Sequence, residues 1–219
     1  MKKLILAAFA VTAAVGVFAQ GTVNFVGNST AGTQHVWGPS ATNPGLSLVG
    51  AGTNDHPTPG TTDYAGSGMS PIGAGGMSGV GGAATTFAQL LAGPNSGSLV
   101  PSGATTTFRT GAAGGLTVLI TDTLQNVALD APIATLEVVA WDNSSGLYST
   151  WATASTAWME GLIVAGESGA FTVQSIGGNV NTPPYFAYPS FNLYSIPEPM
   201  SFALAGLGAA ALLIFRRRK

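Results

Sequence analysis

The stretch Ile133–Asp142, IATLEVVAWD, decides the expected fold. Apart from Glu137 it is apolar on both faces, and it is rich in β-branched residues. A short run of this kind, too short for most helices, is typical of a strand in the middle of a packed sheet. This segment is therefore predicted to be the central strand of the fold.

Further strands are predicted on both sides of this segment, each bounded by Gly, Pro or other turn residues. They cover residues 22–28, 85–92, 115–120, 169–176 and 191–196. No capped amphipathic helix is predicted before residue 200. Several short strands without a solenoid or propeller period predict an all-β fold, a single β-sandwich of jelly-roll type.

The segment 27–82 has few strand signals and is dense in Gly, Pro, Ser and Thr. Within it, GSGMSPIGAGGMSGVGG at Gly66–Gly82 is expected to be a long, flexible, Gly-rich loop. Loops of this length are usually either functional or disordered.

The N-terminus has the pattern of a secretory signal peptide over residues 1–19. Lys2 and Lys3 form a basic region, Leu4–Val17 is apolar, and small residues at Val17 and Ala19 predict cleavage between Ala19 and Gln20. This predicts export through the Sec system and processing by signal peptidase. The alternative is a retained N-terminal membrane helix.

The C-terminus combines three features within residues 196–219. Pro197, Glu198 and Pro199 precede Met200–Phe215, which has no charge and, as a helix, would be roughly 24 Å long. That is somewhat short for a bilayer core of about 30 Å, but flanking cations extend the reach of a helix. Those cations, which the positive-inside rule keeps in the cytoplasm, are Arg216, Arg217, Arg218 and Lys219.

This arrangement resembles the tripartite C-terminal signal of bacterial PEP-CTERM proteins. The resemblance implies that an exosortase, a membrane-embedded protease, recognises the Pro-Glu-Pro motif, removes the helix and passes the body to the cell surface or extracellular matrix. Extended prolines at the membrane surface suit recognition by a protease. The alternative is a permanent single-pass anchor.

The body resembles a recurring exported domain of PEP-CTERM proteins that has no assigned activity. The matching runs are GTVNFVGN, FAQLLAGP, GATTTFRTG, ATLEVVAWD, GESGAFTV and TPPYFAYPSFNLYSIPEP. These motifs favour the β-sandwich, expected over residues 20–195, and add no chemistry. The segment 27–82 is longer and less regular than the resemblance implies.

The charge and the cysteine content exclude several classes of binding partner and several kinds of site for the body. Residues 20–199 hold Arg109 as their one cation against all nine acidic residues, a formal charge of −8. Such a surface repels nucleic acid and anionic lipid, so we exclude those partners. The chain has no cysteine, which excludes disulfides, thiolate nucleophiles and zinc-thiolate sites.

The residues that could support catalysis or metal binding form no convincing pattern. Asp55, His56 and Asp63 are a conceivable metal set, but such ligands are common in polar loops. Serine-elbow and dinucleotide motifs fail, and the acidic pairs needed for glycoside hydrolysis are not defined by spacing. We expect no catalytic, cofactor or metal site and a non-enzymatic protein.

A group of aromatic residues provides the second functional hypothesis. Trp141, Tyr148, Trp151 and Trp158 lie within eighteen residues. They are expected mainly to fill the core; if Trp151 and Trp158 are exposed, their rings could stack on sugars. The expectation is thus a surface or exopolysaccharide-matrix protein, with a carbohydrate-binding module as the alternative.

Overall fold

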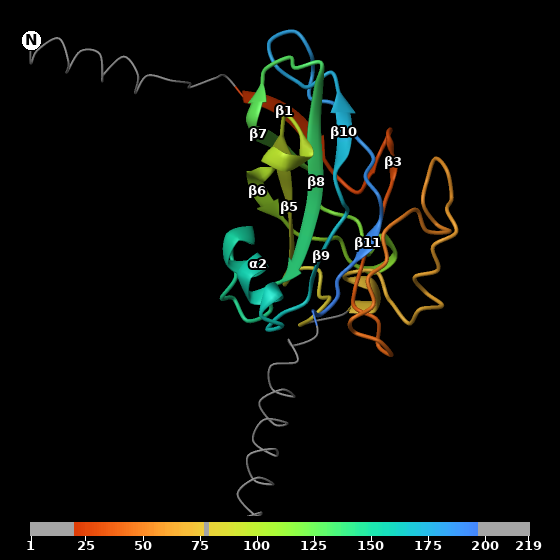
Figure 1. The fold of residues 1–219 in the computed structure, drawn as a ribbon. Coiled ribbons are helices and arrows are strands. Elements are labelled where there is room, and N and C mark those ends of the chain that lie inside the picture. The colour runs from red at the N-terminus through yellow and green to blue at the C-terminus, as the bar shows by residue number, and fades with distance from the viewer. Residues whose placement is uncertain (1–19, 77–78, 197–219) are drawn as a thin grey trace, which may run out of the picture.

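The computed structural model describes residues 20–76 and 79–196. The fold is mostly β, with one short α-helix in this part of the chain (Figure 1). The strands and helices are β1 (Gln20–Phe25), β2 (Asn28–Ser29), β3 (Gly32–Thr33), β4 (Val36–Trp37), η1 (Ala74–Gly76), β5 (Thr86–Gly93), η2 (Ser96–Ser98), β6 (Val100–Thr106), η3 (Gly111–Ala113), β7 (Ile120–Ala128), β8 (Ile133–Asp142), α2 (Trp151–Met159), β9 (Ala165–Glu167), β10 (Phe171–Gln174) and β11 (Phe191–Asn192).

The segment Ile133–Asp142 is strand β8, and it has neighbours along both edges. On one side, β5 pairs antiparallel with residues 135–142 of β8. On the other side β10 pairs with its first half and β9 with its last residues. β6 extends the sheet beyond β5. The prediction of a central strand is confirmed, because a run that is apolar on both faces is stable only where both faces are covered.

The two faces of β8 pack against different parts of the molecule. Leu136 and Val138 face the larger core, which also contains Val23 and Phe25 of β1 and Leu124 of β7. On the opposite face, Val139 and Trp141 of β8 pack against the buried side of α2. The main sheet therefore lies between the β1–β7 pair and the helix.

Strands β1 and β7 continue the wall of the larger core. They pair antiparallel with each other, and β7 contacts β6 through a hydrogen bond from Gln125 N to Ser102 Oγ of 2.9 Å. On its free side, β1 exchanges two backbone hydrogen bonds between Thr22 and Gly177, of 3.0 and 2.9 Å. The N-terminal strand of the core is thus tied to a segment from the later part of the chain.

The segment 27–82 is rich in loops, as predicted, but its described part is packed rather than free. Trp37, Tyr64 and Met69 form a small core of their own, and Ile72 is completely buried in the larger one. The backbone of Gly38 donates to Ser70 O at 2.8 Å. Buried apolar side chains and backbone pairing therefore hold much of the expected flexible loop in place.

The prediction that no capped amphipathic helix precedes residue 200 is wrong. The structure contains α2, and both of its ends are capped. The Thr150 side chain accepts from Thr153 N at its start. At its end, Gly161 N donates to Trp158 O and Leu162 N to Ala157 O, both at 2.9 Å, with Gly161 at φ +74°. This is a Schellman motif. The threonines and serines of the segment have low intrinsic helix propensity and concealed the helix.

The strand predicted over residues 115–120 is also wrong for most of its length. In the structure Thr117 forms only an isolated bridge with Phe108, and β7 begins at Ile120. β7 was not predicted because only Leu124 and Val127 among its later residues are buried and apolar. Likewise, only Phe191–Asn192 of the strand expected over 191–196 is a strand.

Candidate functional site

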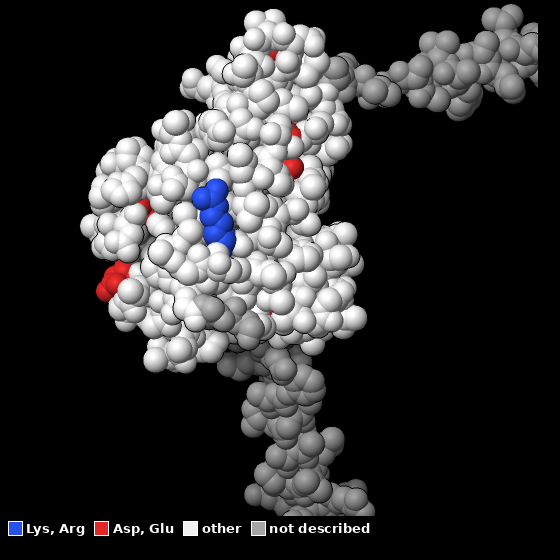
Figure 2. Space-filling model, turned by 180° about the vertical axis from the view of Figure 1, so that it is seen from behind, with Lys and Arg blue, Asp and Glu red and all other residues white. Residues whose placement is uncertain are grey.

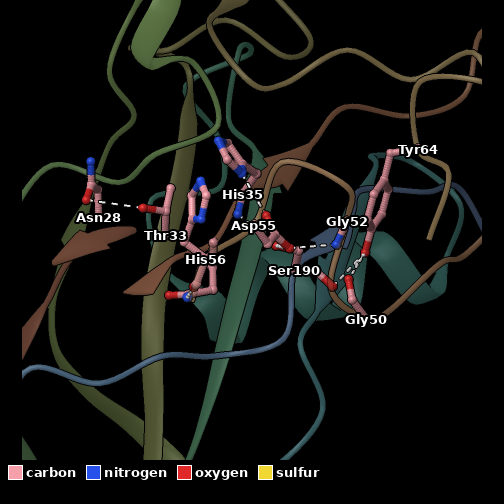
Figure 3. Close-up of polar contacts among 10 residues, drawn as sticks. Asn28, Thr33, His35, Gly50, Gly52, Asp55, His56, Tyr64 and Ser190 are labelled. Carbon is pink, nitrogen blue, oxygen red and sulfur yellow. Dashed lines mark hydrogen bonds and ion pairs between the residues drawn. The ribbon is translucent and has the colours of Figure 1, made fainter. Parts of the chain in front are cut away.

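A buried polar network joins the segment 27–82 to the end of the body (Figure 3). Nδ1 of His35 lies 2.8 Å from Oδ1 of Asp55, and Oγ of Ser190 donates to Oδ2 of the same carboxylate at 2.7 Å. The backbone N–H of Gly52 donates to Oδ2 at 2.7 Å. Ser190 also accepts from the backbone N–H of His35 at 2.8 Å. The network connects three segments that are distant in the sequence.

The electrostatics of Asp55 identify it as an ionised acceptor. Burial alone would raise the pKa of this carboxyl, but hydrogen bonds from His35, Ser190 and Gly52, together with the charge of His35, hold the pKa below its ordinary value. The carboxylate accepts three hydrogen bonds, so it is stable in its charged form.

This network has the residue types of a catalytic triad but not its geometry. In a triad the serine hydroxyl donates to the imidazole of histidine, whereas Ser190 Oγ donates to the carboxylate of Asp55. Ser190 is also completely buried. The arrangement therefore stabilises the fold and offers no accessible nucleophile. Sequence reasoning missed it because His35 and Ser190 stand 155 residues apart.

The three residues considered for a metal site do not come together. Asp55 is buried and bound to His35, while His56 and Asp63 are exposed. Within the two described stretches, no group of three or more His, Cys, Asp or Glu side chains is placed to hold a metal ion.

A second buried carboxylate, Asp122 on β7, has poorer partners. Its Oδ1 accepts from Ala104 N at 3.1 Å, but Oδ2 has no hydrogen-bond partner among the described residues. Burial raises the pKa of Asp122 to about 6. Gly103, at φ +64°, lies directly against the Asp122 side chain. A Cβ atom at position 103 would clash with the Asp122 carboxyl group.

We expect Asp122→Asn to stabilise the body at neutral pH. Because the folded-state pKa is raised, the stabilising effect of the protonated carboxyl is complete below about pH 4 and is lost as the pH rises through about 6. A shift of about two units corresponds to about 3 kcal/mol. Urea unfolding of the full chain in mild detergent should show this decline between pH 4 and 7 in the wild type and a flatter profile in Asp122→Asn.

The control for this prediction is Glu160→Gln, which removes an exposed acid. Its profile should parallel the wild type. Equal pH dependence in Asp122→Asn and the wild type would contradict the assignment of this decline to Asp122.

Among the other described acidic residues, Glu137 and Glu167 lie near each other. Burial and then the nearby charge of Glu167 raise the pKa of Glu137. Asp130 instead accepts backbone hydrogen bonds from residues 179–181, and Asp142 accepts from Ser144 in the predicted turn. These contacts organise loops.

The tryptophans fill the core, which was the expected main role. Trp151 and Trp158 are only 9% and 6% exposed, and Trp158 Nε1 donates to Tyr194 O at 2.9 Å. The ring centroids of Trp141, Trp151 and Trp158 follow one another at 5.7 and 6.0 Å. Trp37 is buried as well. Their ring faces contact other protein groups and leave little surface on which a sugar could stack.

Residues 194–196, the last that the structure describes, are held on the body by hydrogen bonds and apolar packing. Tyr194 N donates to Ala165 O at 2.8 Å, and Ser195 N to Pro44 O at 2.8 Å. The side chain of Ile196 packs against the aromatic cluster beneath α2. The folded body thus extends to Ile196, next to the Pro-Glu-Pro residues.

The surface of the body has very few charges, as the face in Figure 2 shows. Arg109 is the one cation among the described residues. Its surroundings on this face are nearly all uncharged (Figure 2). The described surface therefore has no cluster of Lys and Arg of the kind that binds the phosphates of nucleic acid.

Several predicted features lie outside the described residues. They are the signal peptide with Ala19, the motif Pro197, Glu198 and Pro199, the apolar segment 200–215, and the cations Arg216, Arg217, Arg218 and Lys219. Gln20 is described, and β1 begins there. In the described part of the chain, no helix has the length and apolar character needed to span a bilayer.

The body is a mostly β unit, and its described residues lead directly into the C-terminal segment. Residues 195–219 match the PEP-CTERM protein-sorting motif. The chain therefore has the C-terminal sorting signal of an exosortase substrate, which implies export and membrane anchoring before processing. No curated protein and no solved structure matches the chain. The resemblance of the body to an exported domain stays a prediction.

Proposed function

We propose that the chain is the precursor of a non-enzymatic surface or matrix protein. Signal peptidase removes residues 1–19 after Sec-dependent export, and an exosortase removes the C-terminal signal. The product is the body from Gln20 to near Pro197–Pro199, a β-sandwich that contributes to the cell envelope or to an extracellular polysaccharide layer. The observation that carries the proposal is the sorting motif at residues 195–219.

Two features of the body support this proposal. The fold uses the chain from Gln20, the expected mature N-terminus, to Ile196, beside the motif, so both predicted cuts would leave the body whole. The histidine, serine and carboxylate groups of the buried network are used for internal contacts. The carbohydrate-binding alternative has weaker support, because all four tryptophans are buried.

The test is the intact mass of the protein recovered from membrane and medium of the native cell. We expect a product beginning at Gln20 and ending near Pro197–Pro199. In Glu198→Ala the precursor should keep residues 200–219, because the motif read by the protease is changed. Glu160→Ala, which removes an exposed glutamate of the body, should be processed normally. Retention of residues 200–219 in the wild type would show that the tail is a permanent anchor.

A further inference from the structure

Three large apolar side chains are exposed around α2. Leu147, four residues before the helix, is 73% exposed; Met159, its last residue, is 61%; and Leu162, just after it, is 64% exposed. They lie near the two ends of a helix about 14 Å long. We call these three residues and α2 the α2 corner. Exposed apolar groups in one region are typical of an interaction surface.

The chain leaves the body at the same corner. Tyr194 accepts a hydrogen bond from Trp158 of α2, and Ile196 packs against the cluster that α2 covers. In Figure 1 the segment after β11 ends at the same end of the molecule as α2, away from β1. Met159 and Leu162, at the C-terminal end of α2 beside Trp158, are therefore close to the exit point.

The number of residues after the exit limits the distance to the membrane. Only Pro197, Glu198 and Pro199 separate Ile196 from the apolar segment that begins at Met200. Four Cα–Cα steps span at most about 14 Å. In an anchored precursor Ile196 consequently lies within about 14 Å of the start of the membrane segment. The short connection keeps the end of α2 that contacts Tyr194 near the bilayer.

We infer that the α2 corner rests on the outer bilayer surface in the precursor, with Leu147, Met159 and Leu162 in the lipid interface. This inference rests on the proposed anchoring by residues 200–215. The attraction is apolar, because the described body has one cation against eight acidic residues and would be repelled by anionic headgroups. Glu160, between Met159 and Leu162, is exposed and is expected to face the aqueous side of the interface. Apolar side chains of interfacial segments reach about 5–10 Å into the headgroup region.

The absence of cysteine from the chain allows a direct test. Leu147→Cys, Met159→Cys and Leu162→Cys are labelled one at a time with an environment-sensitive fluorophore in the full-length precursor. The precursor is reconstituted in phosphatidylcholine vesicles that contain a lipid-attached quencher. The matched control is Val180→Cys, because Val180 is 86% exposed and its N–H contacts Asp130, just before β8. α2 follows the other end of β8, about 30 Å away.

We expect lipid-attached quenching at the three corner positions to exceed that at position 180 by at least about twofold, as for side chains held at headgroup depth. Equal, solvent-like signals at all four positions, in a precursor that stays with the vesicles after an alkaline wash, would overturn the inference and leave the proposed sorting intact. A precursor that washes off would overturn both. Shielding of the corner only in native membranes that contain the exosortase would overturn lipid contact in favour of a protein partner.

Discussion

Replacing Asp55 with alanine is expected to lower the free energy of unfolding by about 3–5 kcal/mol, because several hydrogen bonds to a buried carboxylate are lost and their donors stay buried. The change removes the acceptor for His35 Nδ1, Ser190 Oγ and Gly52 N. Ser190 is completely buried, so its hydroxyl is left in a place that water does not reach. Unsatisfied groups of this kind cost far more than exposed ones.

The measurement is urea unfolding of Asp55→Ala in the full chain. Because the folded-state pKa of Asp55 is lowered, the stabilisation is present at neutral pH and is lost as the pH falls below the ordinary value of 3.8. The difference between wild type and variant should therefore shrink on acidification. Asp55→Asn, which keeps the volume and one acceptor oxygen, should lose about half as much. A loss within about 0.5 kcal/mol, as for exposed sites, would contradict the structural role of the network.

The second large effect is expected for Trp141→Ala. This side chain is completely buried, its Nε1 donates to Tyr148 O at 2.6 Å, and its ring lies 5.9 and 5.7 Å from those of Phe87 and Trp151. Removing it leaves a cavity between the main sheet and α2, at a cost of about 3–5 kcal/mol. Because the cavity lies beneath α2, the helix should also become more accessible to proteases.

Two measurements test this prediction separately. Urea unfolding followed by circular dichroism gives the loss of stability, and limited proteolysis reports cutting in residues 143–164. Leu147→Ala, at a 73% exposed position, should change stability by no more than about 0.5 kcal/mol. Unchanged resistance of residues 143–164 to protease in Trp141→Ala would show that the tryptophan does not hold α2 on the sheet.

The parts of the fold that local sequence determines were predicted well. β8 and β5 are apolar runs bounded by turn residues, and their bounds lie within one residue of those expected. The sorting signal is also local, because Pro-Glu-Pro, an apolar run and cations are contiguous. In each case the signal lies in one short stretch.

The parts that depend on distant contacts were missed. Asp55 meets Ser190 across 135 residues, and no local pattern connects them. Met69 and Ile72 are buried in the structure. The sequence did not predict this, because the many glycines around them are typical of a flexible loop and their distant partner residues are not evident from local sequence. For α2, low helix propensity concealed a segment that is stabilised by Trp151 and Trp158 in the core.

Segments from the first third of the body pair with segments near its C-terminal end, and this affects the order in which the body can fold during secretion. β4 pairs with β11, with Val36 opposite Phe191, and Tyr64 donates to the carbonyl of Ser190 at 2.7 Å. A chain that crosses a membrane with its N-terminus first presents residues 20–64 long before residues 190–194 arrive. The early segments therefore wait without their partners, and folding of the body is completed only when translocation has nearly ended.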